Sequence, residues 1–447
     1  MQARLCCNSG MALLFGILSC YLLVPAKSSV VVALPTTGEA ISHNTMATVD
    51  GRSIPMYLVI TSAWWPTIYN RTAGVATFGQ FDFSGSVTVV ITISDTIIIS
   101  AVVKTIIRGM PVSFVPTISS SPASFTVSEP GQYYVCVNDD WPNSIHIFAN
   151  PLQTNPPSKT GTGVQVINPG NYSARIQLTG GNTILYMGPG RYFLTGTTGI
   201  ELGANQHLYM EDGAFLYLSH YASTLTGVSL FGAGSTLTGR GVIDGSLQMG
   251  IASMDAFSIS GNVITIHTTT NPNQFLAGDS VTLGALTGKY TYLNGVTLTV
   301  LATGLSSLQI QADYEHADDS GSGLWPFAIV NPTQLVPWMV TLGNAGTVAD
   351  GFICRDSPYT TTVIAGSPQG YAVVNNYKAL GWRLETDGVH IDSWVNGSIT
   401  NSFIRTYDDH VRINNNFNRT ASNFLISNIL IFQQRGHALF INVGYNV

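Results

Sequence analysis

Short apolar segments broken by glycine, asparagine and aspartate recur after residue 180, and they constrain the fold more than any other feature of the sequence. Each is long enough for one strand and too short for a helix. The clearest of them are 182–186, 207–210, 214–217, 228–231 and 241–244. Strands this short and this irregularly spaced suit a solenoid in which each coil pairs with the next. A second β-sandwich is the alternative that this pattern leaves open.

The composition favours an all-β protein of more than one domain. Charged residues make up 9% of the 447 residues and hydrophobic ones 45%, which is typical of neither disordered chains nor coiled coils. Runs of valine, isoleucine, threonine, tyrosine and phenylalanine are short, and no long stretch keeps a helical period. A chain of this length usually divides into two or three domains, because single cores stop growing at smaller sizes.

The first residues have the pattern of an export signal. Arg4 precedes the apolar run 11–18, and Pro25-Ala26 offers a cleavage region. The run is shorter than the roughly 20 residues that a membrane-spanning helix needs. We therefore predict a signal peptide over 1–29 and a secreted, extracellular protein, with a membrane anchor or a lipoprotein signal as the alternatives.

The remaining chain divides into two domains and an insertion. Alternating apolar and polar residues between turns predict an antiparallel β-sandwich over 30–155, and a proline-rich linker follows it. Residues 160–447 then have the solenoid pattern, which predicts a parallel β-helix. Hairpin-like alternation interrupts that pattern over 255–322 and predicts a small inserted β module, with a structural role or a grip on carbohydrate.

The charge balance restricts the partners. The formal net charge is −6 and no lysine- or arginine-rich run occurs, so the chain lacks the electrostatic footprint of a nucleic-acid-binding protein. The negative net charge also disfavours a strongly polyanionic substrate, although a local basic groove would override this overall repulsion. We expect no cofactor, no metal, no membrane partner after signal removal, and a monomer.

Three aspartates stand out in a chain so poor in charge: Asp387, Asp408 and Asp409. A buried carboxylate is costly unless it is partnered or used. Asp387 precedes the other two by about one solenoid coil. Since coils stack about 4.8 Å apart, acids one coil apart on the same face become neighbours. Adjacent aspartates in a regular strand would point to opposite faces, so we expect a turn or bulge that aims both at one site.

Such a carboxylate cluster is what glycosidic hydrolysis requires. One acid must protonate the leaving oxygen while another carboxylate activates water or attacks. The alternative is turn chemistry combined with a calcium site, which would need more carboxylates and carbonyls in one loop than the sequence offers there.

The sequence also resembles the polygalacturonase and dextranase clan of glycoside hydrolases, which have a right-handed parallel β-helix and three active-site aspartates. Family 49, the dextranase and isopullulanase group, is the more similar branch because it too has a sandwich before the helix. The segments that carry this resemblance are 133–137, 143–151, 186–192, 209–214 and 238–245. The resemblance covers about 130–447, without the insertion.

Position by position, the resemblance assigns Asp387, within Thr-Asp-Gly, to the first aspartate of the clan and Asp408-Asp409 to the pair that follows. It implies a reaction that inverts the anomeric centre, in which one aspartate is the general acid and the others position and deprotonate water. We expect Asp408 to be the acid, although sequence cannot rank three coupled carboxylates.

Several neighbours of the acids are candidates for substrate binding. His437 lies in a Gly-His pair similar to the polygalacturonase motif whose histidine assists the acid. It follows Asp409 by more than the length of one ideal coil, so it lies either beside the cluster or outside it. Tyr407 is a candidate to stack on a sugar ring. Arg405, Arg412 and Arg435 are candidates to orient hydroxyls or act on the aspartates, with plain surface charge as the alternative.

The sequence leaves three hypotheses about function. The sandwich favours a neutral α-glucan, dextran first. The Arg-Ile-Lys signature that grips a galacturonate carboxylate is not found, which places a polygalacturonase-like pectin hydrolase second. A non-catalytic β-helical carbohydrate-binding protein is the alternative from another class.

Overall fold

The structure is a computed structural model. It describes residues 28–39, 41–42, 44–60, 75–94, 96–119, 122–141, 143–194, 199–218, 227–245, 251–268, 280–284, 297–303, 307–322, 327–330, 338–357, 359–365, 370–381, 386–392, 395–414, 421–432 and 436–442. The regular structure in these ranges consists of strands, which confirms the all-β prediction. The predicted signal peptide lies almost wholly outside them. No helix of a length and apolarity that would cross a membrane occurs in these ranges.

An N-terminal β-sandwich of two sheets forms first in the chain, as predicted. One sheet contains β1 (Ser29–Val31), β4 (Tyr57–Ile60), β5 (Val75–Ser84), β7 (Ala101–Ile107), β8 (Met110–Phe114), β11 (Gly131–Val137) and β12 (Ile145–Pro151). The other contains β2 (Thr45–Val49), β3 (Arg52–Ile54), β6 (Val87–Ile93), β9 (Thr117–Ile118) and β10 (Pro122–Val127). Alternating buried residues, as in β6, fill the space between the sheets.

A right-handed parallel β-helix follows the sandwich, as predicted. Its larger, 14-stranded sheet folds into two faces and contains β13 (Val164–Ile167), β14 (Gly170–Tyr172), β15 (Ile184–Met187), β16 (Gly190–Leu194), β18 (His207–Met210), β19 (Ala214–Leu218), β21 (Thr236–Gly239), β22 (Val242–Asp244), β29 (Val348–Asp350), β30 (Ile353–Arg355), β32 (Ala372–Asn375), β33 (Lys378–Leu380), β35 (Val395–Arg405) and β37 (Ser422–Ile431). The third face is a seven-stranded sheet of β17 (Ile200–Leu202), β20 (Val228–Leu230), β28 (Trp338–Leu342), β31 (Thr360–Ala365), β34 (Val389–Asp392), β36 (Val411–Asn414) and β38 (Leu439–Asn442).

The inside of the β-helix is a continuous apolar column. Each coil contributes inward-facing leucine, isoleucine, valine or methionine to one core cluster that runs from Ile167 to Val411. Fully burying a side chain of this size stabilises the fold by about 1.5–3 kcal/mol. Parallel pairing in register stacks these residues coil upon coil, so the short strands found in the sequence become a long, regular support.

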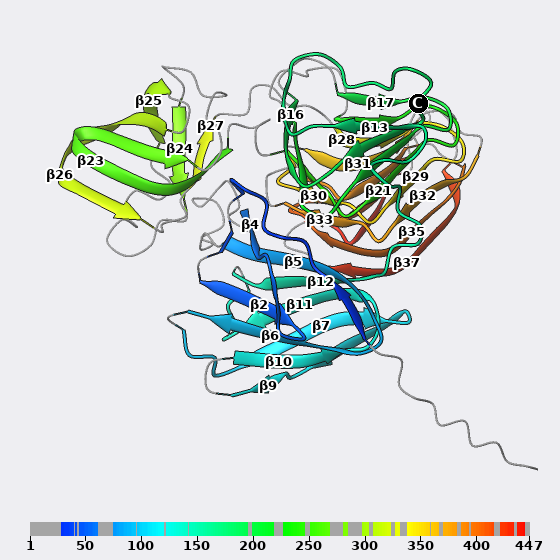
Figure 1. Ribbon diagram of the computed structural model, residues 1–447. Helices are drawn as coiled ribbons and strands as arrows, with labels where there is room; N and C mark the ends of the chain where they lie inside the picture. Colours follow the sequence, from blue (N-terminus) through cyan, green and yellow to red (C-terminus); the bar gives the residue numbers. More distant parts are fainter. Residues whose placement is uncertain are drawn as a thin grey trace, which may run out of the picture.

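A closed barrel is inserted between two coils of the β-helix. It consists of β23 (Ile251–Thr268), β24 (Ser280–Gly284), β25 (Thr297–Thr303), β26 (Ser307–Ser322) and β27 (Phe327–Val330). Its strands therefore run from 251 to 330, whereas the sequence predicts the insertion over 255–322. On either side the coils pair directly, with Thr236 opposite Val348, so the β-helix continues as though the intervening segment were absent. Figure 1 shows the barrel to one side of the β-helix.

The sandwich packs against the β-helix (Figure 1). Aromatic and charged side chains make this contact. Tyr57 of the sandwich meets Phe215 of the β-helix with 4.9 Å between ring centroids. Arg240 pairs with Asp82 at 2.7 Å, both of them buried. Arg405 is fully buried and contacts His146 at 2.8 Å. The expectation that Arg405 orients substrate is therefore wrong, because its guanidinium faces the sandwich.

Candidate active site

The three aspartates come together at one edge of the seven-stranded sheet. Asp387 lies two residues before β34, and Asp408 and Asp409 lie in the turn that leads into β36. One carboxylate oxygen from each lies within 4.8 Å of one from each of the others. Asp387 and Asp409 are buried, and Asp408 is partly exposed. The turn replaces the regular strand in which adjacent aspartates would point apart.

Strand register places these residues one above another. Val389, Val411 and Leu439 are paired across three successive coils. Two residues before each of them stand Asp387, Asp409 and His437. These three residues therefore form one column at the edge of the sheet.

Main-chain amides connect the members of this column. The amide of Asp409 donates to Oδ1 of Asp387 at 2.8 Å, and the amide of His437 donates to Oδ1 of Asp409 at 3.0 Å. Two further backbone bonds hold the turn, from Asp408 to the Thr386 carbonyl at 3.0 Å and from Gly388 to the Asp409 carbonyl at 2.9 Å. The acids are thus positioned by the backbone of the neighbouring coil.

Alternation within the strands selects which side chains face the site. In β34, Val389 and Ile391 belong to the apolar core, so His390 between them points out of the core. Arg412 is the partner of His390 in β36 and has the same direction. Both reach Asp387: His390 Nε2 lies 2.5 Å from Oδ2, and Arg412 Nη1 lies 3.7 Å from the same oxygen.

His437 lies beside the cluster. Its Nδ1 lies 2.9 Å from Oδ1 of Asp409, and its side chain is 63% exposed, so the ring is offered to solvent at the site. The glycine before it makes this approach possible. Gly436 has a φ of +61°, and a Cβ on it would lie 2.4 Å from the carbonyl carbon of Asp408. A side chain there would therefore displace Asp408.

A second histidine, His410, supports the site from behind. Its ring is fully buried and its two nitrogens lie 3.1 Å and 3.0 Å from the carbonyl oxygens of His437 and Phe432. Burial lowers the pKa of His410 below its usual value, and the two carbonyls partly oppose this. His410 thus ties the coil that carries His437 to the coil that carries Asp409.

Of the residues expected to bind substrate, two lie at the cluster and one is hidden. Arg412 and His437 contact the acids directly. Tyr407 is only 3% exposed, so its ring has almost no face free for stacking on a sugar. His390 is the neighbour that sequence reasoning missed. The available signal was its polar ring within the apolar alternation Val389–Ile391.

This arrangement can perform acid–base chemistry on an oxygen-rich substrate. Three carboxylates, two imidazoles and a guanidinium converge on a small space, and groups of this kind supply and remove protons. Asp387, Asp408 and Asp409 are also close enough together to ligate a metal ion.

No model of a protein family and no curated protein matches this sequence. Among solved structures, Dex49A from Penicillium minioluteum is similar, with a TM-score of 0.53 and 15% identity over 92% of this chain and 71% of that one. The family 28 exopolygalacturonase of Yersinia enterocolitica also matches, with a TM-score of 0.32 and 12% identity over 80% of this chain and 69% of that one. The first of these likenesses confirms the fold. The chain therefore shares the β-helical fold of Dex49A.

Proposed function

We propose that this chain is a secreted glycoside hydrolase that cleaves the α-glycosidic bonds of a polysaccharide at Asp387, Asp408 and Asp409. The observation that carries the proposal is the convergence of the three carboxylates, each with an oxygen within 4.8 Å of the others, on the outer edge of a β-helix. Within such a cluster one carboxyl group can protonate a leaving oxygen while another activates water, as glycosidic hydrolysis requires. The shared fold supports the same conclusion.

The surroundings of each aspartate suggest its role. Asp387 accepts hydrogen bonds or ion pairs at both oxygens, and Asp409 accepts an amide and faces His437, so both are held in fixed positions. Asp408 is the most exposed of the three. We assign Asp408 as the general acid that protonates the leaving oxygen, and Asp387 and Asp409 as the pair that holds and deprotonates water.

The spacing suits a water held between two carboxylates. A water that donates to two oxygens at about 2.7–2.8 Å each spans up to about 5.5 Å, and the observed separation lies within 4.8 Å. It is shorter than the roughly 6.5–9.5 Å between carboxyl groups of most inverting glycosidases. We propose inversion on the basis of the resemblance and of a water bridged between the two carboxylates. Proton NMR of the anomer that forms first tests this proposal.

A neutral α-glucan such as dextran is the first candidate substrate. The cluster is acidic and the chain carries a net charge of −6, so a polyanion gains nothing from the overall field. Polygalacturonate is the second candidate, because the partly exposed guanidinium of Arg412 at the cluster could bind a substrate carboxylate.

Reducing-end release from dextran, pullulan and polygalacturonate tests the proposal. We expect wild-type protein to cleave one of the three and Asp408→Asn to lose at least about 10²-fold in kcat, as expected for removal of a general acid. Asp139→Asn, which changes an exposed aspartate of the sandwich, is the matched control and should keep full activity. If wild-type protein binds a glycan tightly and cleaves none of the three, it is a binding protein and the proposal fails.

A further inference from the structure

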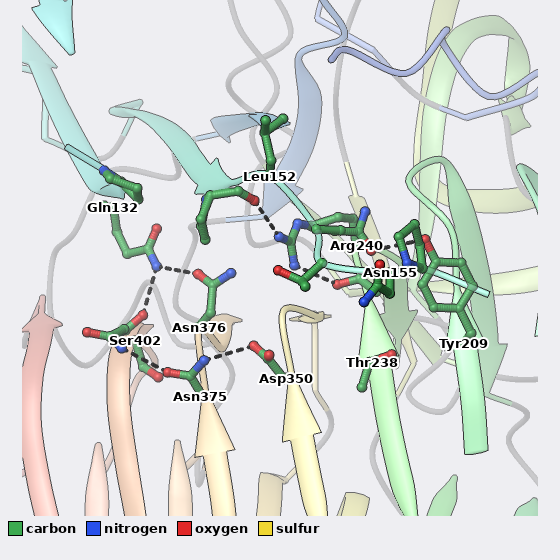
Figure 2. A pocket seen from close by; sticks show the side chains of 18 of the residues that line it. Gln132, Leu152, Asn155, Tyr209, Thr238, Arg240, Asp350, Asn375, Asn376 and Ser402 are labelled. Carbon is green, nitrogen blue, oxygen red and sulfur yellow. Dashed lines mark hydrogen bonds between the residues drawn. The ribbon is translucent and has the colours of Figure 1, made fainter. Parts of the chain in front are cut away.

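A polar pocket of about 600 Å³ lies between the sandwich and the β-helix, away from the three aspartates. Its lining comes from β7 and β11 of the sandwich, from residues 151–157 and from the 14-stranded sheet. The aspartates belong to the edge of the other sheet, and none of them lines this pocket. Figure 2 shows side chains of both domains that point into the same space. Its volume falls within the roughly 300–1,000 Å³ of small-molecule sites, which often occur at domain interfaces.

The floor of the pocket is a ladder of amide side chains, one or two from each coil. Asn375 donates to Asp350 at 3.0 Å, and Asn401 donates to Asn375 at 2.9 Å. Asn428 donates to Asn401 from the next coil. Successive coils lie about 4.8 Å apart, so the ladder offers hydrogen-bonding groups at a regular short interval.

Gln132 reaches this floor from the sandwich, and its orientation is fixed by its partners (Figure 2). Its Nε2 donates to the main-chain carbonyl of Asn401 at 2.9 Å and to Oδ1 of Asn376 at 3.0 Å. A backbone carbonyl can only accept, so this side of the amide must be the nitrogen. Asn376 is fixed in turn, because its own nitrogen donates to Asn150, which also accepts from Lys378.

This orientation leaves acceptor atoms without donors. Oε1 of Gln132 and Oδ1 of Asn428 are buried and have no hydrogen-bond partner within the described part of the chain. Neither oxygen has surface open to the pocket, so both belong to the packing beneath its floor. The ladder itself offers accessible groups: Asn401 is exposed, and its amide nitrogen uses only one of its two N–H groups on Asn375. The second N–H can donate to a ligand hydroxyl.

The remaining wall restricts the class of ligand. The charged groups at the pocket are already paired: Arg240 with Asp82 at 2.7 Å and Asp350 with Asn375. Tyr209 lines the opposite side with its hydroxyl bonded to Gln153, and Leu152 and several proline rings add apolar surface. Amide groups for hydroxyls, beside apolar surface for C–H faces, suit a neutral sugar better than an anion or a cation.

We propose that this pocket is a second carbohydrate site, which binds a short stretch of neutral oligosaccharide on the side of the β-helix that faces the sandwich. The inference rests on the pocket itself and holds whether or not the aspartates hydrolyse the same glycan. Asn401 contributes polar contacts, and Tyr209 and Leu152 contribute the apolar ones. A long polysaccharide held here would remain near the enzyme between cleavage events.

Hydrogen exchange of the full chain measures binding at this site directly. The Asp387→Asn protein is mixed with isomaltoheptaose, maltoheptaose or heptagalacturonate in separate experiments. We expect one of the two neutral probes to protect residues 375–376, 401–402 and 428–430. Leu152→Trp, introduced into the same protein, fills the pocket without removing a hydrogen bond and should weaken this protection at least tenfold in probe concentration. Leu34→Trp, at an exposed leucine outside that pocket, is the matched control.

The outcomes separate this proposal from the proposed function. Protection by a neutral probe that Leu152→Trp removes supports the second site. No protection by either neutral probe, protection by heptagalacturonate alone, or protection that survives Leu152→Trp overturns it. Hydrolysis is measured in parallel in the protein with an intact Asp387. If Leu152→Trp still cleaves polymer and Asp387→Asn does not, the catalytic proposal stands regardless of binding in the pocket.

Discussion

The main-chain amide of Asp409 donates a 2.8 Å hydrogen bond to Oδ1 of Asp387, which lies one coil below it. One oxygen of Asp387 therefore belongs to the framework that holds the next acid, while the other faces His390 and Arg412. The same residue has a structural role through Oδ1 and a chemical role through its charge. The two roles respond differently to substitution.

Asp387→Asn and Asp387→Ala should separate these roles. Asparagine keeps an oxygen for the Asp409 amide, so we expect nearly unchanged stability and a kcat at least about 10²-fold lower. Alanine also leaves the buried amide without its acceptor, which costs about a further 1–3 kcal/mol in the free energy of unfolding. Urea unfolding and initial rates measure the two effects. Equal stability of the two variants would show that the hydrogen bond does not support the turn.

Gly436→Ala should disable the site by displacing Asp408. The added Cβ would lie 2.4 Å from the Asp408 carbonyl carbon, whereas at Gly180, which has a similar φ of +64°, a Cβ would meet no atom within 4 Å. Both substitutions impose similar backbone strain of about 1–2 kcal/mol. We expect only Gly436→Ala to lower kcat, by at least about tenfold. If Gly180→Ala lowers kcat equally, strain and not contact with Asp408 is the cause.

Asp212 should make stability depend on pH at the seam between the two domains. Burial raises the pKa of this carboxyl from 3.8 to about 7, and the Gln80 side chain that bonds it at 2.8 Å partly opposes the shift. Between those pH values the folded state binds more protons than the unfolded state. The contribution of Asp212 to stability therefore falls as pH rises from about 4 to about 7, and it is constant above that.

The test compares wild type with Asp212→Asn, which keeps an oxygen for Gln80. We expect the two melting temperatures to be similar near pH 4 and to diverge as pH rises, with the variant higher by at least about 1 °C at pH 8, which corresponds to about 1 kcal/mol for a chain of 447 residues. Thermal unfolding followed by circular dichroism measures both. A constant difference across this range would contradict a titrating Asp212.

Removal of metal ions should leave the proposed hydrolysis intact. Asp387, Asp408 and Asp409 are close enough to share a cation, but the reaction assigned to them moves protons only. We expect full activity after dialysis against excess EDTA. Activity that is lost in EDTA and restored by calcium would show that the cluster is a metal site, because calcium prefers clustered carboxylate oxygens.

The sequence predicted the carboxylate cluster because one coil separates its members and the register within β34 and β36 is regular. It could not place His437, because the coil that leads from β36 to β38 is longer than the one before it. Coil length varies where loops leave the β-helix, and the pairing rules of strands do not set the length of a loop. The spacing of two residues in the sequence therefore predicts that they stack only where the length of the coil between them is known.

The contacts between domains could not be predicted for a different reason. Arg405 stands near the aspartates in the sequence, yet its neighbours are Ser144 and His146 of the distant sandwich. Side chains that point in opposite directions from one strand reach different partners. Only the packing of the sandwich on the β-helix brings Arg405 to Ser144 and His146. Arg412 lies in a short strand whose direction the apolar alternation fixes, and it contacts Asp387.

The uninterrupted pairing of Thr236 with Val348 has a consequence for how such proteins diversify. Since the coils on either side of the barrel pair directly, the stacking of the coils does not restrict the size or fold of the segment inserted between them. Exchange of the barrel for another module, or its replacement by a short loop, leaves the column of Asp387, Asp409 and His437 on an unchanged support. A different module at this position therefore requires no change in the stacking of the coils that carry the three aspartates.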